Sequence, residues 1–310
     1  GGERMIYTCT LNPSIDYRIE AESFELGELN RADTSSFYPG GKGINVSRVL
    51  KNLGTPNIAL GFLGGFTGKF IVDCLNEEKV VHDFIFHEGP TRINIKLKEK
   101  DEETEINGVG AEITEESREL LLKKIRMLTK DDVLVLSGSL PPSIEFDYYK
   151  EIARICHENG VGLVIDISNP RLKELLQYEP LLIKPNQYEL GDILGENLTT
   201  IDGILAGGRT LNQLGAKNII ISMGGDGAAF INDQKTLIAK APSGEAKSTV
   251  GSGDSMVAGF IAAYRQSGDV EQAFRYSVAA GSATAFSDDL CQKADVEKLL
   301  SSVEIHSEEQ

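Results

Sequence analysis

Tryptophan is absent from the sequence, and cysteine, histidine and methionine each occur only four times in 310 residues. The cysteines are scattered and form no Cys-x-x-Cys pair, so the sequence predicts neither a thiolate metal site nor a redox dithiol. The histidines form no His-Glu-x-x-His pattern, which argues against a histidine-bound zinc site. We therefore expect free thiols, and histidines with surface or core roles.

Long apolar runs are also missing. No segment approaches the roughly 20 apolar residues that a membrane-spanning helix needs, and no signal peptide is apparent at the start of the sequence. Residues Gly1–Arg4, which precede Met5, resemble the remnant of an expression tag. These features favour a cytoplasmic protein without a membrane partner.

Basic residues are outnumbered, with 31 lysines and arginines against 47 acidic residues and a net charge of −16. Such a field repels nucleic acid and anionic membranes, so neither is an expected partner. A phosphorylated ligand is still possible, provided that a few local cations and backbone N–H groups bind it.

Short apolar runs alternate with longer segments of helical periodicity. The runs are typical of strands buried on both faces of a sheet, at residues 6–11, 133–136, 163–167, 181–183 and 219–221. The helical segments lie at residues 46–53, 115–128, 146–159, 201–214, 254–266 and 270–286. This alternation predicts an α/β fold with an open, mostly parallel sheet, in which ligands bind at the carboxyl ends of the strands.

Two segments interrupt this pattern, at residues 16–37 and 91–107. They carry short alternating runs, such as Thr91-Arg-Ile-Asn-Ile-Lys-Leu-Lys, which predict half-exposed strands. Together they could form a small sheet that covers a site, although ordinary edge hairpins are the alternative. The main domain would then comprise residues 5–15, 38–90 and 108–305.

The first chemical cluster is the turn Gly251-Ser252-Gly253-Asp254, which precedes an apolar helix. Glycine amides at a helix N-terminus form an anion site. Asp254 would lie beside that anion, where it could act as a general base. A simple helix cap is the alternative interpretation of this carboxylate.

A second glycine-rich turn, Gly40-Gly41-Lys42-Gly-Ile-Asn45, also precedes a helix. Its glycines permit close approach of the backbone to a ligand, and Lys42 and Asn45 could bind an anion or hydroxyl groups. The segment 64–70 looks like a P-loop but lacks its spacing, because Leu63 and Phe70 occupy the positions of the first glycine and the final serine or threonine.

Three further polar clusters follow strands. They are Ser137-Gly-Ser139-Leu-Pro, Lys184-Pro-Asn186-Gln-Tyr-Glu189 and Ser222-Met-Gly224-Gly225-Asp-Gly227. Because each follows a strand at the same edge of the predicted sheet, we expect all three to line one crevice. Asn186 and Glu189 could hold Mg²⁺ directly or through water, or could form a helix capping box.

These clusters, preceded by Asn12-Pro-Ser-Ile-Asp16, occur in the same order in the ribokinase-like, phosphofructokinase-B sugar kinases, which this sequence resembles from Met5 to Leu300. Around the general base the family pattern is Gly-Ala-Gly-Asp, and in this sequence Ser252 replaces the alanine. The resemblance implies a three-layer αβα sandwich with a mostly parallel central sheet and a small β-sheet lid. The sequence looks most like the 1-phosphofructokinases, partly through Thr104-Glu-Ile-Asn107, with tagatose-6-phosphate kinases as near neighbours.

The resemblance also implies roles for individual residues. Asp254 would be the general base, with the amides of Gly251, Ser252 and Gly253 as an anion hole. The substrate would contact Asp16, Arg31, Gly40, Gly41, Lys42, Asn45, Arg92 and Ser139. ATP would lie against Lys184, Asn186, Ser222, Gly224, Gly225, Gly227, Ala279, Ala280 and Ser282.

The implied reaction transfers the ATP γ-phosphoryl group to the C6 hydroxyl of fructose 1-phosphate. Mg²⁺ would be supported by Asn186 and Glu189, mainly through water, and a monovalent cation could bind near residues 248–250. A homodimer through the lid is a further possibility of this resemblance. Two alternatives stay open: a nucleoside kinase, which would not need both Lys42 and Arg92, and a sugar-phosphate sensor without catalysis.

Overall fold

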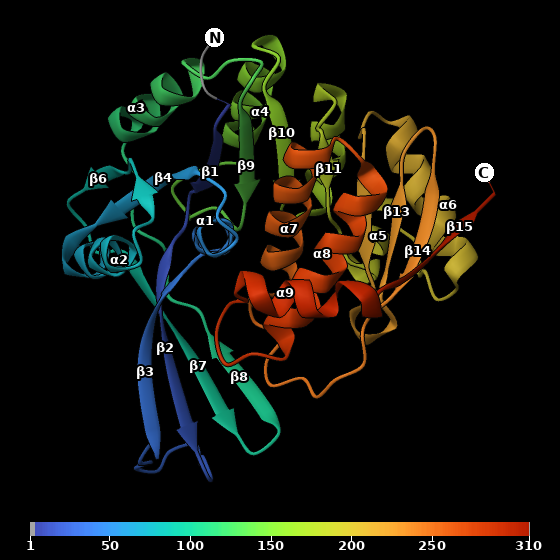
Figure 1. The fold of residues 1–310 in the computed structure, drawn as a ribbon. Helices are drawn as coiled ribbons and strands as arrows, with labels where there is room; N and C mark the ends of the chain where they lie inside the picture. Colours follow the sequence, from blue (N-terminus) through green and yellow to red (C-terminus); the bar gives the residue numbers. More distant parts are fainter. Residues whose placement is uncertain (1–3, 310) are drawn as a thin grey trace.

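The computed structural model describes residues 4–309 and is built on a large sheet with helices on both faces (Figure 1). The strands of this sheet are β1 (Ile6–Thr10), β4 (Asn57–Gly64), β5 (Val81–His82), β6 (Ile85–His87), β9 (Val133–Ser137), β10 (Gly162–Asp166), β11 (Leu182–Ile183), β12 (Ile219–Ser222), β13 (Ala228–Ile231), β14 (Thr236–Lys240) and β15 (Glu304–Glu308). The helices are α1 (Lys42–Asn52), α2 (Gly65–Glu77), α3 (Glu115–Arg126), α4 (Asp147–Glu158), α5 (Gln187–Leu194), α6 (Ile201–Gln213), α7 (Ser252–Ser267), α8 (Val270–Ala285) and α9 (Lys293–Leu299). Short 3₁₀ turns cover Pro170–Tyr178, Gly224–Asp226 and Leu300–Ser302.

The large sheet has the strand order β15-β14-β13-β12-β11-β10-β9-β1-β4-β5, with β6 also paired to β4. Every pairing from β5 to β12 is parallel, whereas β13, β14 and β15 join in antiparallel fashion. The carboxyl ends of β1, β9, β10 and β12 therefore meet at one edge, which is where parallel sheets bind ligands. The predicted strands and helices are all present, with ends shifted by a few residues.

Alternate residues of the central strands enter two different cores. In β9, Leu134 and Leu136 pack with α3, α4, α5 and α6, while Val135 packs on the other face with α1, α7 and α8. Burial on both faces explains why these strands are uninterrupted apolar runs. The sandwich thus has helix, sheet and helix layers.

A second sheet of four strands projects from this body (Figure 1). Its order is β3 (Thr34–Gly40), β2 (Ser14–Ala21), β7 (Arg92–Glu99) and β8 (Glu102–Ile106). The pairing of Asp16 with Tyr38 and Asn94 puts these three residues side by side. The predicted small sheet is therefore present, while its status as a domain with the boundaries given above stays a prediction.

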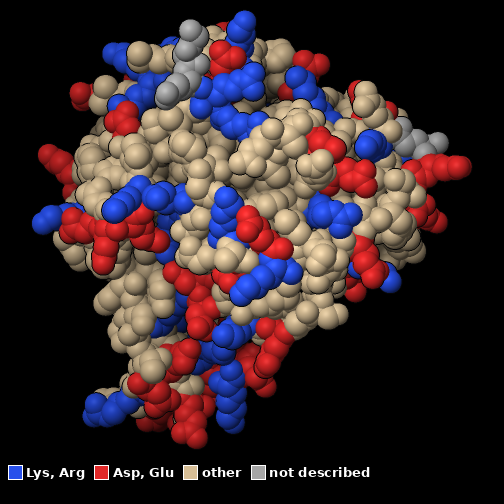
Figure 2. Space-filling model, in the orientation of Figure 1, with Lys and Arg blue, Asp and Glu red and all other residues tan. Residues whose placement is uncertain are grey.

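The two faces of this lid differ in chemistry. Asp16, Asn94 and Lys96 line a cleft on one face, whereas the large apolar side chains Phe37 and Ile106 are 55% and 56% exposed elsewhere on the sheet. Charged side chains crowd on the lid at the lower end of the space-filling view (Figure 2). The strand alternation thus separates a polar ligand-facing surface from an apolar one.

The predicted fold class, a three-layer αβα sandwich with a β-sheet lid, is confirmed. Within residues 4–309, no helix is long and apolar enough to cross a membrane. Residues 1–3 of the expected tag remnant lie outside the described part of the chain.

Candidate active site

A cavity of about 660 Å³ lies between the carboxyl edge of the large sheet and the lid. Residues from both parts line it, most of them polar, and they include Thr10, Asn12, Asp16, Gly41, Lys42, Asn45, Arg92, Asn94, Lys96, Asn107, Ser139, Gly251 and Asp254. Two clusters more than 200 positions apart in the sequence, 40–45 and 251–254, therefore border one cavity.

The turn at residues 251–254 forms the start of α7. Gly251 is the N-cap and has a φ of 82°, a left-handed conformation that favours glycine. A helix leaves the N–H groups of its first turn without partners inside the helix. The N–H of Ser252 already donates to the Thr249 carbonyl at 3.2 Å, so Gly253 and Asp254 supply the remaining first-turn amides.

Asp254, the third residue of α7, is only 6% exposed. Asn45 Nδ2 donates to its Oδ2 at 3.0 Å, which ties α1 to α7. Burial raises the pKa of the Asp254 carboxyl, the nearby Lys42 opposes that shift, and Asp166 adds to it. A buried carboxylate with a raised pKa at the wall of a polar cavity has the properties of a general base.

Asp166 is a site residue that the sequence interpretation missed. It ends β10, is 2% exposed, and its Oδ2 lies 3.7 Å from the Nζ atoms of both Lys42 and Lys184. The Asp166 carboxylate is the main cause of the raised pKa of Lys42. Its signal in the sequence was an aspartate that ends an apolar strand at the ligand-binding edge.

The Asp16 carboxylate faces the cavity from β2, and Ser14 Oγ donates to it at 2.8 Å. A Cβ atom at Gly40 would lie 2.6 Å from Asp16 Oδ1, so only glycine permits this close approach. Gly41 has a φ of 119° and precedes α1, which carries Lys42 and Asn45 into the cavity. These five predicted residues are therefore brought together.

Arg92 and Ser139 also line the cavity, and Asn12 connects them. Arg92 donates through Nε and Nη2 to the Asn12 carbonyl, at 3.2 and 2.9 Å, and Asn12 Nδ2 donates to Ser139 Oγ at 3.0 Å. Burial lowers the pKa of the Arg92 guanidinium, while Asp16 opposes this shift. The two hydrogen bonds to Asn12 therefore orient the Arg92 guanidinium at the wall of the cavity.

The expectation for Arg31 is corrected. Arg31 is exposed in the segment between β2 and β3 and does not line the cavity. The physical reason is distance, because the seven residue steps from Ser14 to Ala21 carry the lid tip about 23 Å from the base of the lid. Lys96, which the sequence interpretation missed, is the lid lysine that lines the cavity, and its Nζ pairs with Glu105 at 3.0 Å.

Residues 137–139 line this cavity, but the clusters at 184–189 and 222–227, which were expected to line the same crevice, are not among its lining residues in the described part of the chain. Lys184 Nζ would be 2.9 Å from a Cβ at Gly253, so this lysine abuts the turn at residues 251–254. Asn186 and Ser222 form an isolated bridge between the ends of neighbouring strands. Gly224 and Gly225 have open space around them, whereas a Cβ at Gly227 would collide with the Ala239 carbonyl, so Gly227 has a packing role.

The expectation for α8 is also corrected in part. Ala279 and Ala280 are fully buried, and the Cβ of Ala280 lies against Gly259 of α7. Their side chains are occupied in the contact between α7 and α8 and cannot touch a nucleotide. Ser282 is the predicted residue of this group that is partly exposed.

The family model described as pfkB family carbohydrate kinase matches residues 9–295. The chain belongs to this family of carbohydrate kinases. A 1-phosphofructokinase of Bacillus subtilis (strain 168) is 44% identical over 97% of this chain and 99% of its own length. A D-tagatose-1-phosphate kinase of Bacillus licheniformis is 39% identical over 97% and 99% of the respective lengths.

The fold of this kinase is similar to that of phosphofructokinase-2 from Escherichia coli, solved in complex with substrates and products. The TM-score is 0.91 at 30% identity, with 96% of this chain and 98% of that chain covered. The likeness extends over the sandwich and the lid together.

The predicted metal residues of the kinase form the capping box that was the alternative. Asn186 Oδ1 accepts from the Glu189 N–H at 2.8 Å, Glu189 Oε1 accepts from the Asn186 N–H at 2.9 Å, and Ser168 donates to Glu189 Oε2. Residues 4–309 contain no group of three or more His, Cys, Asp or Glu side chains that could hold a metal ion.

Proposed function

We propose that this kinase transfers the γ-phosphoryl group of ATP to the C6 hydroxyl of fructose 1-phosphate, which gives fructose 1,6-bisphosphate. The observation that carries the proposal is the buried Asp254 at a helix N-terminus, on the wall of a cavity that also holds Arg92 and Ser139. The similarity to a 1-phosphofructokinase along nearly the whole chain supports the choice of substrate.

Asp254 would accept the proton of the C6 hydroxyl as the phosphoryl group is transferred. The amides at the start of α7 would stabilise the charge on that group, with Gly253 and Asp254 as donors and Gly251 shaping the turn. The Lys42 ammonium interacts with the carboxylates of both Asp166 and Asp254, and each of them raises its pKa. We therefore assign Lys42 to the transferring phosphoryl group. Positioning and electrostatics supply most of the catalysis in such reactions.

The sugar would bind against Asp16, Gly40, Gly41 and Asn45, and its phosphate against Arg92 and Ser139. Charge-assisted hydrogen bonds from a fixed guanidinium favour a phosphate dianion. ATP would lie towards Lys184, Asn186, Ser222, Gly224 and Gly225, with Ser282 near its base or ribose. Mg²⁺ would neutralise phosphate charge, supported through water by Asn186 and Glu189, and a monovalent cation would bind near residues 248–250.

A second candidate is a tagatose phosphate. The D-tagatose-1-phosphate kinase of Bacillus licheniformis covers the same length of chain at 39% identity. Its named substrate carries a phosphate in the same place as fructose 1-phosphate, so Arg92 and Ser139 could serve either sugar. Tagatose 6-phosphate would need the opposite orientation.

A coupled assay of ADP release tests these alternatives with fructose 1-phosphate, tagatose 1-phosphate, tagatose 6-phosphate, fructose 6-phosphate and adenosine. We expect the highest kcat/KM for fructose 1-phosphate. A preference for either tagatose phosphate would replace the substrate assignment, and a preference for adenosine would contradict the phosphate site. No ADP release with any of them, from protein that binds fructose 1-phosphate in calorimetry, would indicate a sensor.

We infer further that two copies pair through the apolar face of the lid. Phe37 and Ile106 are large apolar side chains exposed on this sheet, and Tyr17 stacks on Phe37 with ring centroids 4.5 Å apart. Exposed apolar surface of this kind is typical of a protein interface. Light scattering should give a dimer for the native chain and a monomer for the Phe37→Ser, Ile106→Ser double variant.

A further inference from the structure

One stripe of polar side chains on α1 connects that helix to the elements around the catalytic turn. Asn45, Arg48 and Asn52 are spaced by three and four residues, so they lie on one helix face. Asn45 contacts Asp254, and the two following members contact the segment 287–292 that comes after α8. The stripe therefore runs from the catalytic carboxylate to a segment that has no role in the proposed chemistry.

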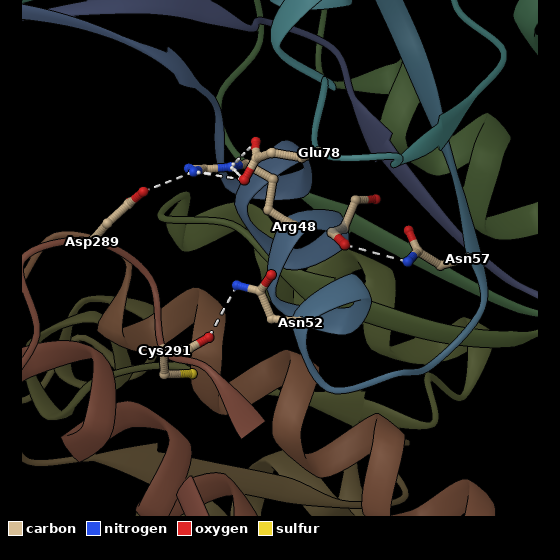
Figure 3. Close-up of polar contacts among 7 residues, drawn as sticks. Arg48, Asn52, Asn57, Glu78, Asp289 and Cys291 are labelled. Carbon is tan, nitrogen blue, oxygen red and sulfur yellow. Dashed lines mark hydrogen bonds and ion pairs between the residues drawn. The ribbon is translucent and has the colours of Figure 1, made fainter. Parts of the chain in front are cut away.

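Arg48 is the charged member of the stripe, and it is only 7% exposed. Its Nε and Nη2 donate to both oxygens of Glu78 at 2.9 to 3.2 Å, and Nη2 also donates to Asp289 Oδ2 at 2.9 Å. Figure 3 shows the guanidinium between these two carboxylates, with Asn52 directed at the Cys291 carbonyl. Arg48 thus joins α1 to the C-cap of α2 and to the segment 287–292.

The segment 287–292 supports the back of the catalytic turn. A Cβ atom at Gly251 would lie 2.5 Å from Leu290 Cδ2, so the turn and Leu290 are in close contact. The Cys291 N–H donates to Thr284 Oγ1 at 3.0 Å, and that hydroxyl pairs with Ser255 Oγ, which donates to the Gly251 carbonyl at 2.8 Å. A shift of this segment would therefore be transmitted to Gly251.

A buried ion pair is weak support for stability, because the cost of removing charges from water offsets much of the attraction. Its value lies in fixed geometry, since a guanidinium that donates to two carboxylates has a defined orientation. Here the geometry that is fixed relates α1, which carries Lys42 and Asn45, to the N-terminus of α7, which carries Asp254.

We propose that Arg48 is a positioning residue, which holds the segment 287–292 through Asp289 and so fixes the turn at Gly251 relative to α1. Glu78 holds the guanidinium in place from the other side. This inference rests on the proposed function, because it takes the turn 251–254 as the catalytic centre. Displacement by about 1 Å of such a group can lower turnover by up to about 100-fold, even when the change is remote from the chemistry.

Two carboxylates on one guanidinium provide a matched pair of variants. Asp289→Ala releases the segment behind Gly251, whereas Glu78→Gln weakens the other contact and leaves the segment attached. We expect Asp289→Ala to lower kcat by about tenfold, with KM for ATP and for the sugar phosphate within about threefold of the native values. Glu78→Gln should keep kcat within about twofold of the native value, even if it lowers the melting temperature as much as Asp289→Ala does. Asp289→Asn, which retains a hydrogen-bond acceptor, should recover most of the lost kcat.

Hydrogen–deuterium exchange of the ligand-free native protein and variants provides a readout besides activity. Asp289→Ala should increase exchange in a peptide covering residues 248–256, and Glu78→Gln should not. The inference is overturned if Asp289→Ala leaves both kcat and this exchange unchanged, or if Glu78→Gln changes them equally. If the native protein is inactive on every substrate tested, the proposed function fails, and the exchange comparison still decides whether Arg48 positions the turn.

Discussion

The large sheet and the lid are built from opposite sequence patterns, and they contribute different parts of the site. The strand β9 is a run of apolar residues buried on both faces, whereas β7 alternates polar and apolar side chains. The sandwich presents Asp166 at the end of β10 and the turn at Gly251 at the start of α7, both beside a buried core. The lid presents Asp16 and Arg92 from a sheet with one solvated face. We therefore propose that the sandwich carries the chemistry and that the lid contributes to substrate recognition.

The largest expected effect concerns the sandwich side of this comparison. Asp254→Asn removes the proposed base while it keeps the shape and the contact with Asn45. Because loss of a positioned base costs about 10²–10⁴-fold in rate, kcat should fall by that factor. Steady-state kinetics measures kcat, and calorimetry should show ATP affinity within a few-fold of the native value. Near-normal turnover would contradict the assignment of Asp254 as the general base.

The next effect compares the stability of the two sheets. Leu136 is fully buried in β9, and Ile106 is 56% exposed in β8. Leu136→Ala should lower the free energy of unfolding by about 2–5 kcal/mol, because it leaves a cavity in the core. Ile106→Ala should lower it by less than about 1 kcal/mol. Urea denaturation compares the two, and equal losses would contradict the distinction between a packed sandwich and a half-solvated lid.

Substrate recognition by the lid is tested at Arg92. Arg92→Met removes charge-assisted hydrogen bonds worth about 1.5–3 kcal/mol, which corresponds to a rise of about 10–100-fold in KM for the sugar phosphate. KM for ATP should change little, because Arg92 is not among the residues proposed to bind the nucleotide. Arg92→Lys keeps the charge but loses the fork, so it should be intermediate. A variant that lowers kcat and leaves KM unchanged would show that Arg92 acts in the chemical step, which would contradict the proposed division of roles between the sandwich and the lid.

The smallest effect is a shift in pH dependence. Burial raises the pKa of Asp254, so kcat/KM should fall on the acid side at a pH above the ordinary range of an aspartate. Lys42 lowers that pKa, and its removal must therefore raise it. As the pH is lowered, the residual activity of Lys42→Met should therefore decline at a higher pH than the activity of the native enzyme does. A shift to lower pH would contradict the electrostatic coupling between Lys42 and Asp254.

Much of this kinase could be predicted from the sequence by itself. Apolar runs and helical periodicity specify their own elements, because burial on one or both faces dictates the pattern. Glycine-rich turns such as 40–41 and 251–253 are likewise local, since the backbone conformation at Gly41 and Gly251 favours glycine whatever lies nearby. The fold class and the position of Asp254 in a helix start followed from these local rules.

Contacts between distant residues were decided by the tertiary structure. Asn45 meets Asp254 across 209 positions and Arg48 meets Asp289 across 241, and no local pattern encodes such pairs. The packing of the layers likewise decides that Asp166 pairs with Lys42 and Lys184 and that Ala279 and Ala280 are buried. The length of the lid strands decides how far Arg31 lies from the cavity. Local sequence preferences determine each helix or strand, but only the folded tertiary structure determines which side chains face each other.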